Sequence, residues 1–97
     1  MFWSQKSREI EQFAVTLARD FASRCPPAGV SAQAQQVARA IDETCNRAAA
    51  YQRERRLGIF YRAKLGTSFK LQLKEMGYAG EFINTLTAQL LLSMSGK

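Results

Sequence analysis

The residues of this sequence whose types and spacing best suit ligand binding are basic side chains, most of them in its second half. Guanidinium groups bind phosphate or carboxylate oxygens two at a time, and aromatic rings stack on unpaired bases. Tyr51, Phe60 and Tyr61 are interleaved with these cations. The candidate residues for binding nucleic acid or an acidic partner are Arg47, Arg53, Arg55, Arg56, Arg62 and Lys64, and Lys70 and Lys74 follow them.

On an α-helix these cations would not form one stripe. At about 100° per residue, Arg53, Arg56 and Lys64 fall on one side and Arg55 and Arg62 on another. Charge that wraps around a helix is also typical of a solvated face that keeps a small protein in solution. The pattern therefore leaves three interpretations open: nucleic acid, an acidic protein partner, or a plain basic surface.

The net charge of the chain is concentrated in the same region. The first fifty residues carry six basic and five acidic groups, whereas the remainder carries eight basic and three acidic groups. The second part therefore holds +5 of the total charge of +6. A local basic surface favours anionic partners in general and does not select one of them.

Residues that could perform catalysis or bind metal are scarce. The chain has no histidine, which removes the commonest general base and zinc ligand. Asp42 and Glu43 are adjacent, so on a helix they point to different sides; surface pairing within a helix, such as Glu43 with Arg47 or Asp20 with Arg24, is the simpler interpretation. No phosphate-binding glycine motif is present. We therefore expect no enzyme activity, no metal and no cofactor.

Two cysteines, Cys25 and Cys45, fit a chain that folds in a reducing compartment. We interpret them as buried structural thiols, although a disulfide stays open. The sequence shows no secretory signal and no run of about 20 apolar residues that could cross a membrane. These observations predict a cytoplasmic protein.

The elements that must position these groups are helices. Apolar residues make up 46% of the chain and charged residues 23%, and Ala, Gln, Arg, Leu and Glu are abundant helix formers. We predict one domain, 1–97, that is all-α: a small up-and-down helical bundle of three to four helices. The expected helices lie near 5–24, 32–56, 59–76 and 81–94, with Ser31 as the N-cap of the second.

Apolar residues at helical spacing define the expected core. On the first helix they are Ile10, Phe13, Ala14, Leu17, Ala18 and Phe21. On the second they are Ala34, Val37, Ala38, Ile41, Cys45 and Ala48. On the third the stripe reads Ile59, Arg62, Leu65, Gly66, Phe69, Leu73 and Met76, and on the last Phe82, Ile83, Leu86, Leu90 and Met94.

Residues 57–76 also fit a β-hairpin, because Phe69, Leu71 and Leu73 alternate with polar residues and Gly66 could occupy a turn. The region is poor in the β-branched residues that strands favour. A lone hairpin would also be marginally stable. We therefore favour the helix, which Gly77 would end in a left-handed conformation.

Several large apolar residues exceed what such a bundle easily buries. The predicted partner or self-association surface consists of Phe2, Trp3, Phe60 and Leu92. Membrane-surface contact through Phe2, Trp3 and Lys6 has less support. The function that these residues favour is a non-catalytic helical protein-binding or self-assembly module, with a homo-oligomer or a protein partner. The alternative is a basic accessory protein that binds RNA or DNA.

Two segments of the chain resemble a known family. Residues 40–45 (Ala-Ile-Asp-Glu-Thr-Cys) and 60–68 (Phe-Tyr-Arg-Ala-Lys-Leu-Gly-Thr-Ser) are similar to the four-helix-bundle proteins encoded in intervening sequences of large-subunit ribosomal RNA genes. The sequence departs from that family at 45–48, where Cys-Asn-Arg-Ala stands in place of an Asn-x-x-Glu-Gly-type segment. The resemblance implies a basic helical bundle that assembles into rings and binds nucleic acid or a nucleic-acid enzyme.

Overall fold

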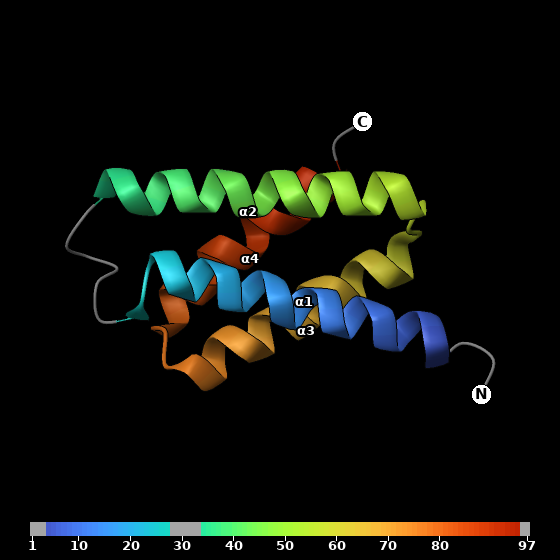
Figure 1. The fold of residues 1–97 in the computed structure, drawn as a ribbon, viewed down its shortest axis with the longest axis horizontal. Helices are drawn as coiled ribbons and strands as arrows, with labels where there is room; N and C mark the ends of the chain where they lie inside the picture. The colour runs from blue at the N-terminus through green and yellow to red at the C-terminus, as the bar shows by residue number, and fades with distance from the viewer. Residues whose placement is uncertain (1–3, 28–33, 96–97) are drawn as a thin grey trace.

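A computed structural model describes residues 4–27 and 34–95 and contains four helices (Figure 1). They are α1 (Ser4–Arg24), α2 (Ala34–Arg55), α3 (Ile59–Met76) and α4 (Gly80–Ser95). The predicted all-α bundle is confirmed, and no strand occurs in the described residues. None of the four helices is both long enough and apolar enough to cross a membrane.

The ambiguous segment 57–76 is helical, as the scarcity of β-branched residues predicts. Gly77 ends α3 with φ of 99°, and its N–H group donates to the carbonyl oxygens of Leu73 and Lys74. The N–H group of Tyr78 also donates to Leu73 O, at 3.3 Å. This left-handed end is the arrangement that glycine accommodates without strain. The predicted cap Ser31 lies outside the described residues.

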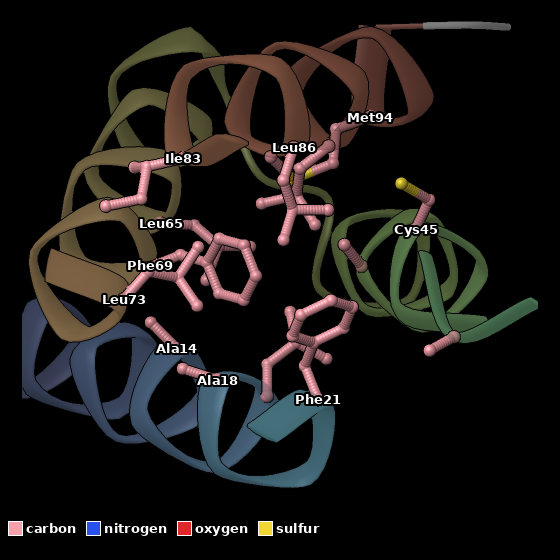
Figure 2. Packing of buried hydrophobic residues seen from close by; sticks show 14 of the residues in the cluster. Ala14, Ala18, Phe21, Cys45, Leu65, Phe69, Leu73, Ile83, Leu86 and Met94 are labelled. Carbon is pink, nitrogen blue, oxygen red and sulfur yellow. The ribbon is translucent and has the colours of Figure 1, made fainter. Parts of the chain in front are cut away.

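The helices surround one core in an order that differs from their order along the chain. In Figure 1, α1 and α3 run in one direction, and α2 and α4 run in the other. Helix α1 packs on α3 and α2, and α4 packs on the same two helices. Figure 2 accordingly shows the order α1, α3, α4, α2 around the core. The consecutive helices α2 and α3 therefore lie diagonally opposite each other, while α1–α3 and α2–α4 are parallel neighbours.

The core contains the apolar stripes of all four helices (Figure 2). The stripe of α1 is predicted well, since only Phe13 among its six residues is half-buried and the others are buried. The largest fully buried side chains are Phe21, Phe69, Ile10, Leu17, Leu65, Leu73, Leu86, Leu90 and Met94. Every helix except α2 contributes to this set, and α2 contributes small residues instead.

Two predicted core positions on α2 are wrong. Ala34 and Ala38 are exposed, whereas Ala40 and Thr44 are buried together with Val37. The buried face of α2 is therefore rotated from the predicted one by part of a turn. Alanine occurs on both faces of this helix, so apolar spacing alone does not define which alanines face the core.

Ile59 and Arg62, which the sequence assigned to the core stripe of α3, also differ from the prediction. Ile59 is exposed and Arg62 is half-buried. Ile59 is the first residue of α3, where the neighbouring helices no longer cover the stripe. Helical spacing identifies a face and does not show how far along the helix that face is covered.

Tyr78 connects the α3–α4 turn to the end of α1 by a hydrogen bond and by packing. The buried Tyr78 hydroxyl donates to the carbonyl oxygen of Cys25, and its ring lies 5.8 Å from that of Phe21 and 5.5 Å from that of Phe82. Burial, and next the neighbouring Cys25 thiol, raise the pKa of Tyr78 to about 12. The neutral phenol is therefore part of the packed structure.

Candidate interaction interface

Three of the six predicted basic residues are paired with carboxylates of α1. Arg55 Nη1 lies 3.0 Å from Glu9 Oε1, and Lys64 Nζ lies 2.8 Å from Glu11 Oε2. Arg47 pairs with Asp20. All six side chains in these pairs are partly exposed, so the pairs add little to stability. They do, however, neutralise the cations that a phosphate would need.

The ion pairs between α1 and α2 also correct a prediction. Asp20 pairs with Arg47 and Glu43 pairs with Arg24, each across the two helices. The sequence indicated pairs within one helix, Asp20 with Arg24 and Glu43 with Arg47. Because α1 and α2 are antiparallel neighbours, residues four apart on one helix meet residues four apart on the other, and the four charges exchange partners.

The remaining three basic residues lie in two separate places. Arg53 and Arg56 are exposed at the end of α2, where Arg56 takes a left-handed φ of 52°, and neither forms an ion pair with a described residue. Arg62 lies on α3 and donates from Nη1 to the carbonyl oxygen of Met94 on α4 at 3.0 Å. The six residues therefore differ in their surroundings: three are ion-paired, two have no ion pair among the described residues, and Arg62 is held by α4.

The aromatic residues between the cations are also mostly engaged. Tyr51 stacks on Phe13 with ring centroids 3.8 Å apart and planes 5° apart. The ammonium group of Lys6 lies 4.9 Å from the centroid of the Tyr61 ring. Only Phe60 among the three interleaved aromatic residues presents its ring to solvent. A stacking platform for nucleic-acid bases is thus reduced to one ring.

Large apolar side chains are exposed on α3 and α4. The exposed fraction is 86% for Phe60, 73% for Ile59, 70% for Leu92 and 53% for Leu71. Phe60 and Leu92 were predicted as surface residues of a partner interface, and the structure places both on the surface. Phe2 and Trp3 lie outside the described residues. Ile59 was missed because its spacing matches the core stripe.

A groove of about 550 Å³ runs between α3 and α4 beside these residues. We call it the α3–α4 groove and define it by Ile59, Arg62, Ala63, Gly66, Thr67, Lys70, Thr87, Leu91 and Ser95. At its floor the helices approach closely, since a Cβ atom on Gly66 would lie 2.8 Å from Leu91 Cδ2. Arg62 and Lys70 are the charged residues among the described side chains that line it, and both are cationic.

Two buried polar atoms in the wall of the α3–α4 groove have no hydrogen-bond partner in the described structure. They are Arg62 Nε and Thr87 Oγ1, and Thr87 as a whole is only 8% exposed. A buried donor or acceptor without a partner costs about 1–3 kcal/mol. Such groups are uncommon in folded proteins and call for an explanation.

Neither cysteine has features of a reactive site. Cys25 and Cys45 are free and buried, and burial is the main cause that raises the pKa of each thiol. Cys25 Sγ lies 3.8 Å from the carbonyl oxygen of Gln36, which it contacts across the bundle end. Within residues 4–27 and 34–95, no three side chains of the metal-binding types come together.

The uncharged character of α4 is a signal that the sequence analysis did not use. From Phe82 to Ser95 the chain contains no Asp, Glu, Lys or Arg, although charged residues make up 23% of the whole sequence. Asn84, Thr85, Ala88, Gln89 and Leu92 form the exposed side of this segment.

Comparison of the chain with protein-family models, curated proteins and solved structures found no significant match.

Proposed function

We propose that this chain is a non-catalytic helical protein-binding or self-assembly module whose contact surface lies on α3 and α4. One observation carries the proposal: Ile59, Phe60 and Leu92 expose most of their apolar surface, on two helices of which one has no charge from Phe82 to Ser95. Large exposed apolar side chains that exceed what a small domain buries are a feature of protein interfaces. A large exposed aromatic ring is also a frequent anchor in such interfaces.

Nucleic-acid binding is the alternative, and the charge pairing weakens it. A phosphate that approached Arg47, Arg55 or Lys64 would have to displace a carboxylate of α1. Arg53 and Arg56 keep this alternative testable, because they are exposed and form no ion pair with a described residue. The resemblance to the intervening-sequence proteins, with its implied ring assembly, stays a prediction.

The test is photo-crosslinking in cells that make the protein. Benzoyl-phenylalanine replaces Phe60 in one version and Gln35, an exposed residue of α2, in the control. We expect protease-sensitive adducts from position 60 and none from position 35. An adduct of twice the mass of the chain would identify self-assembly, which a sizing column at about 100 µM protein would also show.

Two results would count against the proposal. Adducts that a nuclease removes, and that the combined change of Arg53, Arg55 and Arg56 to Gln abolishes, would establish the nucleic-acid alternative. Binding to labelled RNA should then weaken steeply with salt, with a slope of about −0.7 for each neutralised phosphate. Equal labelling from positions 60 and 35 would mean that α3 and α4 carry no dedicated interface.

A further inference from the structure

The α3–α4 groove has the shape and chemistry of a binding site for a helix from another molecule. Its α3 residues recur at helical spacing from Ile59 to Lys70, so the groove follows α3 for about 16 Å, or three turns. Ala63 and Thr67 are exposed and have small side chains, which lets another backbone approach closely, while Leu91 covers Gly66. Leu91 and Ile59 supply apolar surface along the same length.

The charges along this groove have one sign. Arg62 lies near one end and Lys70 near the other, and no acidic side chain lines it among the described residues. On α3 the two cations are eight residues apart, which corresponds to about 12 Å along the helix axis. An occupant with carboxylates at a similar separation would complement both ends. A second copy of this chain, itself at +6, would bring further positive charge.

Arg62 has an unpartnered donor that such a pair would satisfy. Its Nη1 atom is held by the Met94 carbonyl oxygen at 3.0 Å, while Nε is buried without an acceptor in the described structure. The Nε and Nη2 atoms form one of the two forks by which arginine binds a carboxylate. Because Nε is buried, the guanidinium would turn toward the groove as a carboxylate bound at this fork and accepted from Nε.

Thr87 provides an independent sign that the α3–α4 groove is incomplete by itself. Its hydroxyl oxygen is buried without a partner on the α4 side of the groove, about two turns away from the Met94 carbonyl that holds Arg62. The two unpartnered groups therefore lie in different parts of one groove. Polar side chains of one bound helix can reach both regions only if that helix lies along the groove axis.

We infer that the α3–α4 groove docks an amphipathic helix of a partner protein, with an apolar stripe against Ile59, Ala63 and Leu91 and carboxylates at Arg62 and Lys70. This inference rests on the proposed function and specifies the partner class of the same surface. Phe60 and Leu92 are exposed on the same two helices.

The test uses two synthetic peptides and fluorescence anisotropy. The first is a fluorescein-labelled, capped 18-residue helix of Ala, Leu and Gln with two glutamates seven residues apart, a separation of about 10.5 Å on one face. The control peptide has the same composition, but one glutamate is exchanged with a glutamine two positions away, which turns it by about 200° around the helix. We expect the first peptide to bind at least tenfold more tightly than the control.

Variants of the full chain locate the binding. Arg62→Gln and Lys70→Gln should each weaken binding of the first peptide by about fivefold. Ala63→Glu should abolish it, because Ala63 is exposed in the middle of the α3–α4 groove and the new carboxylate would repel the acidic peptide. Arg19→Gln, on the exposed side of α1, should leave the affinity unchanged. Circular dichroism of each variant should show the helix content of the unchanged protein.

Three outcomes overturn the inference. Equal affinity for the two peptides, or no binding of either, would mean that the groove does not recognise spaced carboxylates. A dimer that Ala63→Glu dissociates would identify a second copy as the occupant. A labelled single-stranded RNA of about 20 nucleotides that binds through Arg62 and Lys70 would identify nucleic acid. Protein adducts from position 60 would sustain the proposed function in the first case, so the two failures are distinguishable.

Discussion

Lys64 and Arg62 stand two residues apart on α3, yet only Lys64 has a carboxylate partner. Lys64 faces α1 and pairs with Glu11 at 2.8 Å, whereas Arg62 faces α4 and keeps a buried Nε without an acceptor in the described structure. The interfaces of α1 with α2 and α3 contain all four of the ion pairs found in the described residues. The α3–α4 interface has none of them and carries a groove instead.

This difference separates a surface that is complete from one that is not. Where α1 meets its neighbours, cations and anions from different helices neutralise one another. Where α3 meets α4, the charges are cationic alone and large apolar side chains remain exposed. A protein that interacts through one face should show this asymmetry, because the partner supplies what that face lacks.

The largest effect tests whether both interfaces share one core. Leu17 on α1 and Leu86 on α4 are completely buried. Leu17→Ala and Leu86→Ala should each lower the free energy of unfolding by about 2–5 kcal/mol, because a cavity adds to the lost transfer energy. Urea unfolding followed by circular dichroism measures the change. A loss below about 0.5 kcal/mol for Leu86→Ala alone would mean that α4 is not an integral part of the core.

The next effect concerns Tyr78, in the turn that joins α3 to α4. The pKa of Tyr78 is about 12 in the folded protein and 10.0 in an unperturbed tyrosine. The folded state therefore holds the phenolic proton more tightly, so its stabilisation is complete below pH 10 and is lost as pH rises through 12. Two pKa units correspond to a loss of about 3 kcal/mol in unfolding free energy.

Tyr78→Phe is the control for this titration. The variant should be less stable near neutral pH, since the hydrogen bond to the Cys25 carbonyl is lost. It should also show a shallower decline above pH 10, leaving the part due to the two buried thiols and to Tyr51, whose pKa values burial also raises. Identical pH profiles for the two proteins would contradict the assignment of this titration to Tyr78.

The smallest effect compares an ion-paired side chain on α3 with an exposed apolar one on the same helix. Glu11→Gln removes the partner of Lys64 and should cost about 0.2–1 kcal/mol, less at high salt. Phe60→Gln, on the exposed side, should change the free energy of unfolding by less than about 0.5 kcal/mol in either direction. Chemical denaturation at 20 mM and 500 mM NaCl distinguishes them. A loss above about 0.5 kcal/mol for Phe60→Gln would contradict the exposure of this ring in the free protein.

Much of the fold follows from periodicity along the chain. The stripe from Ile10 to Phe21 predicts the buried face of α1, and Gly77 predicts the end of α3, because both depend on neighbours within a few residues. The faces of α2 were less predictable, since Ala38 and Ala40 differ in burial but not in residue type. Small residues carry little information about which side of a helix is buried.

The candidate site was harder to predict because it depends on which helices become neighbours. Arg47 could pair with Glu43 by local spacing, yet it pairs with Asp20 on another helix. Arg62 and Leu91 share a groove only because α3 and α4 are adjacent and antiparallel. The excess apolar residues Phe60 and Leu92 and the charge-free stretch from Phe82 to Ser95 are the signals of this surface that the sequence contains.

The diagonal placement of α2 and α3 has a consequence for the order of folding. Helix α2 lies between α1 and α3 in the sequence. The contact between the parallel neighbours α1 and α3 therefore joins segments about 50 residues apart. Loop closure of that length slows a folding nucleus relative to one built from consecutive helices. During synthesis the apolar faces of α1 and α2 would thus stay partly exposed until α3 emerges and the core can form.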